Sequence, residues 1–232
     1  MSVRMLAGVV PSGTPRPETA PEHHRIEHGA LIGLAFDVDD RPLPEAEDAE
    51  RTLAWADRQM RLLCAYVETA DVLPVALGAA FSSTDAIAEN LADRGAAFGT
   101  LLRPLIGHVE LALHLGQCRD SAPRRTPSGV GGRRFLEARQ KRRNARRDRA
   151  MALRSLVEGI DDALRTCASE VRHRDPTRED RIADWSVLVP RDRLTACARA
   201  LETPASLARG EGAAVRLIGP LPAFSFCEEA VS

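Results

Sequence analysis

The chain has 232 residues, a formal net charge of −1, 44% hydrophobic residues and 28% charged residues. These values exclude a wholly disordered chain and a strongly basic or acidic protein, and they allow one large domain or two small ones. No stretch approaches the roughly 18 apolar residues of a membrane-spanning helix, and the amino terminus lacks a signal-peptide pattern, so we expect a cytoplasmic protein.

Short apolar runs and a proline-rich segment begin the chain. The runs Val3–Val10 and Gly29–Val38 predict two strands. Between them, four prolines within residues 11–22 predict a loop. We interpret the three histidines that come next as part of the same solvated polar loop; they are His23, His24 and His28.

The spacing of apolar residues then changes to that of a helix. Residues 45–70 place their hydrophobic side chains on one helical face. The continuous apolar run Val72–Phe81 predicts one buried strand, with Pro74 at its edge or its start. Residues 82–85 offer a helix N-cap, and helical spacing continues to residue 106.

The clearest strand pattern is His108–Leu115. Its residues alternate strictly, so that four apolar side chains share one face: Val109, Leu111, Leu113 and Leu115. The opposite face carries His108, Glu110 and His114. This alternation predicts a half-buried antiparallel strand whose polar face meets solvent.

A long helical pattern spans residues 133–172, after a loop rich in proline and glycine at residues 121–132. Its second half repeats apolar residues at helical spacing, and its first half is overwhelmingly basic. Residues 185–189 predict a further strand, residues 191–201 a short helix, and residues 213–218 the last strand.

Strands and helices alternate in an order typical of an α+β fold with two small domains. Residues 1–107 hold 9 basic against 16 acidic side chains, whereas residues 108–232 hold 23 against 17. We therefore expect an N-terminal α+β domain over residues 1–107 and a C-terminal domain over residues 108–232 that contains the long basic helix. Two helices on one side of an antiparallel sheet bring this second domain close to a ferredoxin-like arrangement.

No arrangement of residues predicts catalysis or a metal centre. His23, His24 and His28 match no closed set of metal ligands, and the strand face with His108 and Glu110 lacks a third ligand. The five cysteines are far apart and form no Cys-x-x-Cys pair, which favours buried thiols in a reducing compartment. The sequence matches no nucleophile motif or phosphate-binding glycine loop. We expect no enzymatic activity and no cofactor.

The basic segment Arg133–Arg149 has two interpretations. Its nine basic side chains would neutralise nucleic-acid phosphates well. However, only one aromatic residue, Phe135, lies among the basic ones, and the whole chain is not basic. We favour a solvated or protein-binding helix, with a nucleic-acid-binding module as the alternative. The candidate contact residues are Arg142, Arg143, Arg146 and Arg147.

Four segments, in matching order, resemble the gas vesicle protein GvpL/GvpF family. Val72–Ser83 resembles the family's "vLP-hydrophobic-RFG-tvF" strand, and His108–Leu113 resembles its "G-x-x-E-h-x-h-k-v" strand. Gly132–Arg139 is similar to the helix start "G-x-x-Y-L-x-x-R". The most specific segment is Gly219–Phe226, whose sequence GPLPAFSF is similar to the closing GPWPPYSF of the family.

The chain also departs from the family pattern. Ala76 and Leu77 stand where the family shows Arg-Phe, so any contact made by that arginine is absent. In the carboxy-terminal run, Leu221, Ala223 and Phe224 replace Trp, Pro and Tyr, which reduces the aromatic surface of the run. Such changes fit a diverged relative with a shifted partner preference.

The resemblance implies a two-domain α+β protein whose second domain is a modified ferredoxin-like fold. It also implies an accessory or minor structural protein of gas vesicle formation, cytoplasmic and associated with gas vesicles. The expected partners are the hydrophobic shell protein and other gas vesicle accessory proteins, with no membrane partner. The carboxy-terminal run supplies further candidate contact residues, namely Pro220, Leu221, Pro222, Phe224 and Phe226.

Overall fold

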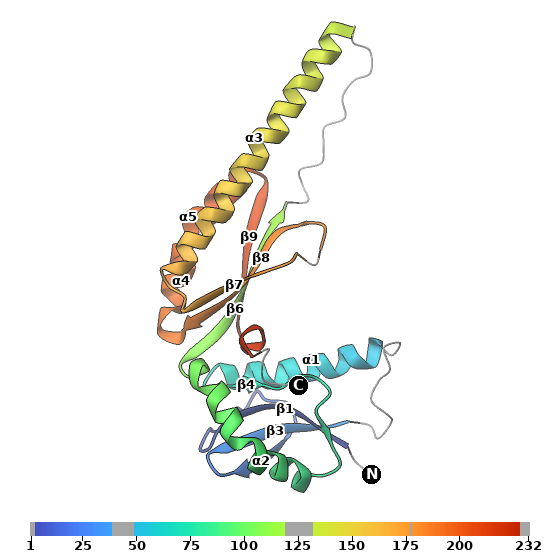
Figure 1. Ribbon diagram of the computed structural model, residues 1–232, viewed down its shortest axis with the longest axis vertical. Coiled ribbons are helices and arrows are strands. Elements are labelled where there is room, and N and C mark those ends of the chain that lie inside the picture. The colour runs from blue at the N-terminus through green and yellow to red at the C-terminus, as the bar shows by residue number, and fades with distance from the viewer. Residues whose placement is uncertain (1–2, 39–48, 119–131, 177, 228–232) are drawn as a thin grey trace. The chain divides into compact units, whose positions relative to one another are not determined.

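The computed structural model describes residues 3–38, 49–118, 132–176 and 178–227, and it has an α+β fold (Figure 1). The chain divides into two compact units. Unit 1 comprises residues 1–111 together with 219–232, and unit 2 comprises residues 112–218. The carboxy-terminal segment therefore belongs to the same unit as the first hundred residues.

Unit 1 contains an antiparallel sheet in the order β2-β3-β1-β4, with β5 also paired to β1. Its strands are β1 (Val3–Pro11), β2 (His24–His28), β3 (Leu31–Val38), β4 (Leu73–Pro74) and β5 (Ala80–Phe81). β1 and β3 confirm the two predicted strands. The predicted loop through His24 and His28 is wrong, because every residue of β2 pairs with β3.

Two helices cover opposite faces of this sheet, α1 (Ala49–Val67) and α2 (Thr84–Leu102) (Figure 1). A side chain added at Gly8 of β1 would meet Leu63 of α1 at 2.9 Å, while Gly33 of β3 faces α2. Both faces being covered, six successive residues are buried in β1 and six in β3. Burial on both sides explains why these strands are continuous apolar runs instead of alternating ones.

The predicted strand over residues 72–81 is wrong as a single element, because only its two ends pair with β1. Between β4 and β5 the backbone departs from regular pairing, and β1 itself carries a register shift between Leu6 and Gly8. The buried side chain of Gln59 satisfies carbonyls at this irregularity: its Nε2 donates to Ala7 O at 2.9 Å and to Val75 O at 2.7 Å. An amide on α1 thus supplements the backbone hydrogen bond from Val75 N to Ala7 O.

The second sheet has the order β7-β8-β6-β9. Its strands are β6 (His108–Gln117), β7 (Glu170–Arg174), β8 (Arg181–Pro190) and β9 (Ala213–Leu221). Three helices lie on one face of it, α3 (Gly132–Arg165), α4 (Leu194–Ala200) and α5 (Glu202–Gly210) (Figure 1). The short 3-10 turns are η1 (Arg103–Leu105), η2 (Arg191–Arg193) and η3 (Phe224–Phe226).

The end of the long helix differs from the prediction. α3 ends at Arg165, and residues up to Arg172, predicted to be helical, instead lead into and form part of β7. Ser169 N donates to Leu188 O at 2.9 Å, after which Val171 pairs with Val187 of β8. Pairing with a buried strand outweighs the weak helical pattern of these residues.

The second half of α3 is anchored on the sheet. Its buried stripe of Leu156, Ile160 and Leu164 confirms the predicted apolar stripe. Trp185 on β8 is 1% exposed, and its Nε1 donates a hydrogen bond to Asp161 Oδ1 of α3 at 2.8 Å. A polar contact therefore supplements apolar burial at this helix–sheet contact.

Among the residues that the structure describes, no helix combines the length and the apolar character needed to cross a membrane.

His23 is buried in unit 1, 6% exposed, contrary to the prediction of a solvated loop. Its Nδ1 lies 2.7 Å from Pro21 O and therefore carries the proton that it donates, while its Nε2 accepts from Tyr66 Oη at 2.8 Å. Burial lowers the pKa of His23 below its ordinary value of 6.5, and the charges of Arg16 and Arg25 act in the same direction. The fold thus favours the neutral form of this imidazole.

We expect acidification to destabilise unit 1 through His23. Because the pKa of His23 is lower in the folded state, His23 of the unfolded chain takes up a proton first as the pH falls. The contribution of His23 to the free energy of unfolding is therefore fully present above pH 6.5 and declines below it. The decline is at most about 1.4 kcal/mol per pH unit, the limit for one proton. Urea unfolding from pH 8 to pH 5 measures it; His23→Gln should flatten the profile, whereas the exposed His28→Gln should not. A profile unchanged by His23→Gln would contradict this account.

Candidate functional site

The carboxy-terminal run is held to unit 1 by a buried carboxylate. Glu110, on β6, is 4% exposed. Its Oε2 accepts from Ser225 N at 3.0 Å and its Oε1 accepts from Ser225 Oγ at 2.6 Å. The prediction of a solvent-facing Glu110 is wrong, because the run that covers it returns from 115 residues further along the chain.

Gly219 starts the run where the backbone comes close to β6. Its φ is +141°, a region that favours glycine, and an added Cβ would lie 2.6 Å from Leu111 Cδ2 and 3.0 Å from Glu110 O. Pro220 follows through a cis peptide bond. The glycine therefore permits both the turn and the close approach.

The predicted contact residues of the run differ in exposure. Pro220 is exposed, and Leu221, Phe224 and Phe226 are half-buried. Pro222 is buried within unit 1. Four of the five residues therefore offer some surface to a partner, and Pro222 has a packing role.

The basic segment forms the first half of α3. Residues 138–151 are all exposed, and the helix extends past α5 (Figure 1). We call residues 138–151 the arm. It holds seven basic side chains and one acidic one, and among the described residues none of the seven has an ion-pair partner. The four predicted contact residues, Arg142, Arg143, Arg146 and Arg147, are all exposed.

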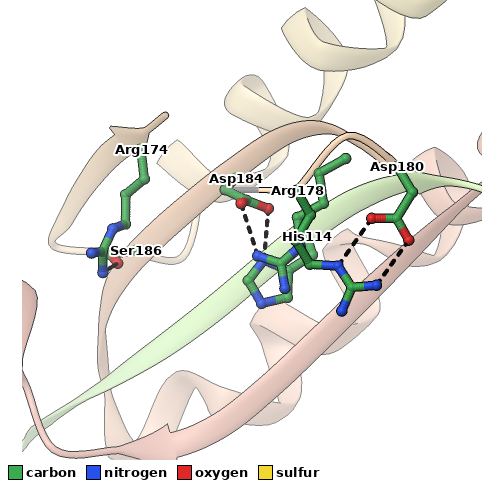
Figure 2. Close-up of polar contacts among 7 residues, drawn as sticks. His114, Arg174, Arg178, Asp180, Asp184 and Ser186 are labelled. Carbon is green, nitrogen blue, oxygen red and sulfur yellow. Dashed lines mark hydrogen bonds and ion pairs between the residues drawn. The ribbon is translucent and has the colours of Figure 1, made fainter. Parts of the chain in front are cut away.

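A polar network that the sequence did not predict lies in unit 2 (Figure 2). His114 Nδ1 donates to Asp184 Oδ1 at 2.7 Å, and Arg181 NH1 donates to Asp184 Oδ2 at 2.8 Å. Arg178 binds Asp180 through two hydrogen bonds of 3.1 and 3.2 Å. The prediction of a solvent-facing His114 is wrong, because its side chain is only 19% exposed and contacts the buried Asp184.

A pocket of about 420 Å³ adjoins this network. Its walls come from the end of β6, from the segment leading into β8 and from β9. The lining residues are His114, Gly116, Gln117, Arg178, Asp180, Arg181, Ala214 and Arg216. Arginine dominates the walls, and Ala214 is the sole apolar side chain among these lining residues.

Neither metal binding nor cysteine chemistry gains support from the described residues. Within them, no three His, Cys, Asp or Glu side chains are grouped so that they could hold a metal ion. Burial raises the pKa of the Cys64 thiol and raises that of Cys197 to about 12, with Cys167 adding to the second shift. Such thiols are protonated at neutral pH and are poor nucleophiles.

Comparison with protein families decides the assignment. The model of the family "Gas vesicle synthesis protein GvpL/GvpF" matches residues 8–228. The chain belongs to the GvpL/GvpF family. The predicted resemblance is thereby confirmed.

Solved structures of GvpL/GvpF family members share the fold. The crystal structure of the gas vesicle protein GvpF from Anabaena sp. PCC7120 superposes with a TM-score of 0.69 at 16% identity, covering 97% of this chain and 96% of that one. GvpF from Microcystis aeruginosa gives a TM-score of 0.67 at 14% identity, covering 97% and 99%. No curated protein matches the chain significantly.

We expect Glu110→Gln to destabilise this GvpL/GvpF chain by about 2 kcal/mol, because an amide accepts through one oxygen only and one of the two hydrogen bonds between residues 110 and 225 is lost. Ser225→Ala should cost less, about 1 kcal/mol, and the double variant should be less destabilised than the sum. Urea unfolding measures all three. Glu89→Gln, at an exposed position on α2, is the matched control. Additive effects of the two changes would show that the pair is not coupled.

Proposed function

We propose that this protein is an accessory or minor structural protein of gas vesicle formation, acting without catalysis and without a cofactor. The observation that carries the proposal is the match to the GvpL/GvpF family over residues 8–228. The similarity of the fold to two GvpF structures supports it. The protein works in the cytoplasm, associated with gas vesicles.

The partners are the hydrophobic shell protein and other gas vesicle accessory proteins. A very apolar subunit must be shielded from aggregation until it joins the growing shell, and a partner with an accessible strand edge or apolar surface can shield it. Two surfaces of this chain fit such contacts. They are the half-exposed apolar residues of the carboxy-terminal run and the arm of α3.

The carboxy-terminal run offers apolar side chains on a backbone that is already in place. Leu221, Phe224 and Phe226 are partly exposed, while Ser225 is fixed by Glu110. A surface that is ordered before binding loses little conformational entropy on association. The run therefore suits direct contact with an apolar partner.

The arm offers charge. Its seven basic side chains have no internal partners among the described residues, so they remain available to acidic side chains of another protein. Arginine binds carboxylates through paired hydrogen bonds, and opposite charges accelerate association. We assign the arm to accessory-protein contacts, through Arg142, Arg143, Arg146 and Arg147.

We further propose that the chain folds as two domains that divide near residue 107, the second a modified ferredoxin-like α/β sandwich, with residues 219–227 returning to the first. The strand order β7-β8-β6-β9 supports the ferredoxin-like arrangement, since the chain enters the sheet at β6 and α3 forms the crossover connection from β6 to β7. The helices on one face of the sheet support it as well (Figure 1).

Deletion of the gene should abolish or deform vesicles in a host that makes them, as judged by buoyancy and electron microscopy. Normal vesicles after deletion would refute the proposed role. Replacing Arg142, Arg143, Arg146 and Arg147 together by Gln should reduce vesicle yield, because the arm loses the charge that attracts acidic partners. The matched control replaces the exposed Arg103, Arg193, Arg199 and Arg209 by Gln, with the same change in net charge and full yield expected.

The same arm variant tests nucleic-acid binding, the alternative function. RNA binding by the purified protein would fall steeply with salt, and neutralising four arginines would reduce the slope. If the variant lost RNA binding while it still captured accessory proteins normally, the arm would be a nucleic-acid site and our assignment of it to proteins would be wrong.

Leu221→Asp should weaken capture of the shell protein about tenfold, because a charge would replace an apolar side chain of the run. A pull-down with purified shell protein measures the change. Leu207→Asp is the matched control, since Leu207 on α5 is 62% exposed and lies outside the run. Equal losses of shell-protein capture in both variants would show that the run is not part of the interface.

A further inference from the structure

The pocket in unit 2 has the chemistry of an anion site. Three arginines line it, Arg178, Arg181 and Arg216, against one lining carboxylate, Asp180. Asp184, which holds Arg181, is itself buried. Positive charge therefore exceeds negative charge where the walls meet solvent.

Two of these arginines are held at fixed positions. Asp180 binds Arg178 through Nε and NH2, and Asp184 binds Arg181 through NH1 (Figure 2 shows the first pair). Each guanidinium carries five N–H groups, so several on each arginine remain unused within the described residues. The carboxylates orient these donors and leave them free to bind a ligand.

Arg216 has no such partner. It lies on β9, its side chain is exposed, and among the described residues it makes no hydrogen bond or ion pair. Arg178 and Arg181 are already paired with aspartates, so Arg216 adds a positive charge that no described residue compensates at the pocket. A bound anion would compensate this charge and would receive hydrogen bonds from groups already in place.

We propose that this pocket binds a phosphate group. The planar fork of arginine matches phosphate oxygens, and several arginines around one site suit a multiply charged oxyanion better than a single carboxylate. The volume of about 420 Å³ accommodates a phosphate or a diphosphate. Among the described residues, no large apolar or aromatic side chain other than the His114 imidazole lines the pocket, so a nucleoside would gain little by entering it.

The sources of the phosphate are distinguished by three probes: inorganic phosphate, pyrophosphate and ADP. Isothermal titration of the full chain at low salt should show saturable one-to-one binding of pyrophosphate that is tighter than that of phosphate. ADP should bind no more tightly than pyrophosphate, because the diphosphate makes the contacts. The proposal would be overturned if none of the three probes bound at millimolar concentration. It would also be overturned if ADP bound more than tenfold tighter than pyrophosphate.

Variants locate the binding. Arg216→Gln should weaken pyrophosphate binding at least tenfold without unfolding the chain, because its side chain is exposed and has no partner among the described residues. Arg209→Gln, an exposed arginine of α5 outside the pocket, should bind like the wild type. The arm variant with four Gln replacements should also retain binding. Loss in the arm variant, or unchanged binding in Arg216→Gln, would place the anion elsewhere and refute the pocket.

An acidic peptide tests the competing ligand. If a poly-glutamate peptide bound at Arg216 and pyrophosphate did not displace it, the pocket would serve protein carboxylates and the proposal would fail. Displacement by pyrophosphate would support it. This inference does not rest on the proposed role in vesicle formation, since each measurement uses the purified chain and a small anion.

Discussion

A buried carboxylate, that of Glu110, determines how unit 1 is completed. A charge removed from water is costly unless it is paired or hydrogen-bonded, and here the backbone and hydroxyl of Ser225 supply two hydrogen bonds. The segment before Ser225 must then cross β6 closely, which Gly219 permits. The exposure of Pro220 and the partial exposure of Leu221 follow from this path. The family's most specific sequence segment is therefore a packing element as well as a possible contact surface.

The arm depends on a different physical principle. A helical segment with every residue exposed gains nothing from tertiary burial, and helices of this length are marginal alone in water. The second half of α3 supplies the tertiary burial that the arm lacks, because Leu156, Ile160 and Leu164 are buried. Asp161 also accepts a hydrogen bond from Trp185. Once this nucleus exists, each further residue adds a helical hydrogen bond at low entropic cost. A charged surface is thus displayed on a rigid support.

The sequence predicts the elements that are buried and misses those that are polar. Hydrophobic residues alone predict β1, β3 and the apolar face of β6. The family resemblance likewise depends on four local segments of sequence. β2 and β7 are not predicted in this way, because in β2 only Ile26 is buried and β7 has no buried residue. Glu110 and His114 occupy the polar face of an alternating strand, and their partners Ser225 and Asp184 lie 115 and 70 residues away. Such pairings depend on tertiary structure, which no local pattern contains.

The return of residues 219–227 to unit 1 has a consequence for biosynthesis. The ribosome makes the chain from its amino terminus, so β1, β3 and the helices around them emerge well before Ser225 exists. Until then the carboxylate of Glu110 lacks the two donors of Ser225. The amino-terminal unit is finished only after residues 219–227 have left the exit tunnel. Loss of residues 219–227 would thus damage the part of the protein that was translated first.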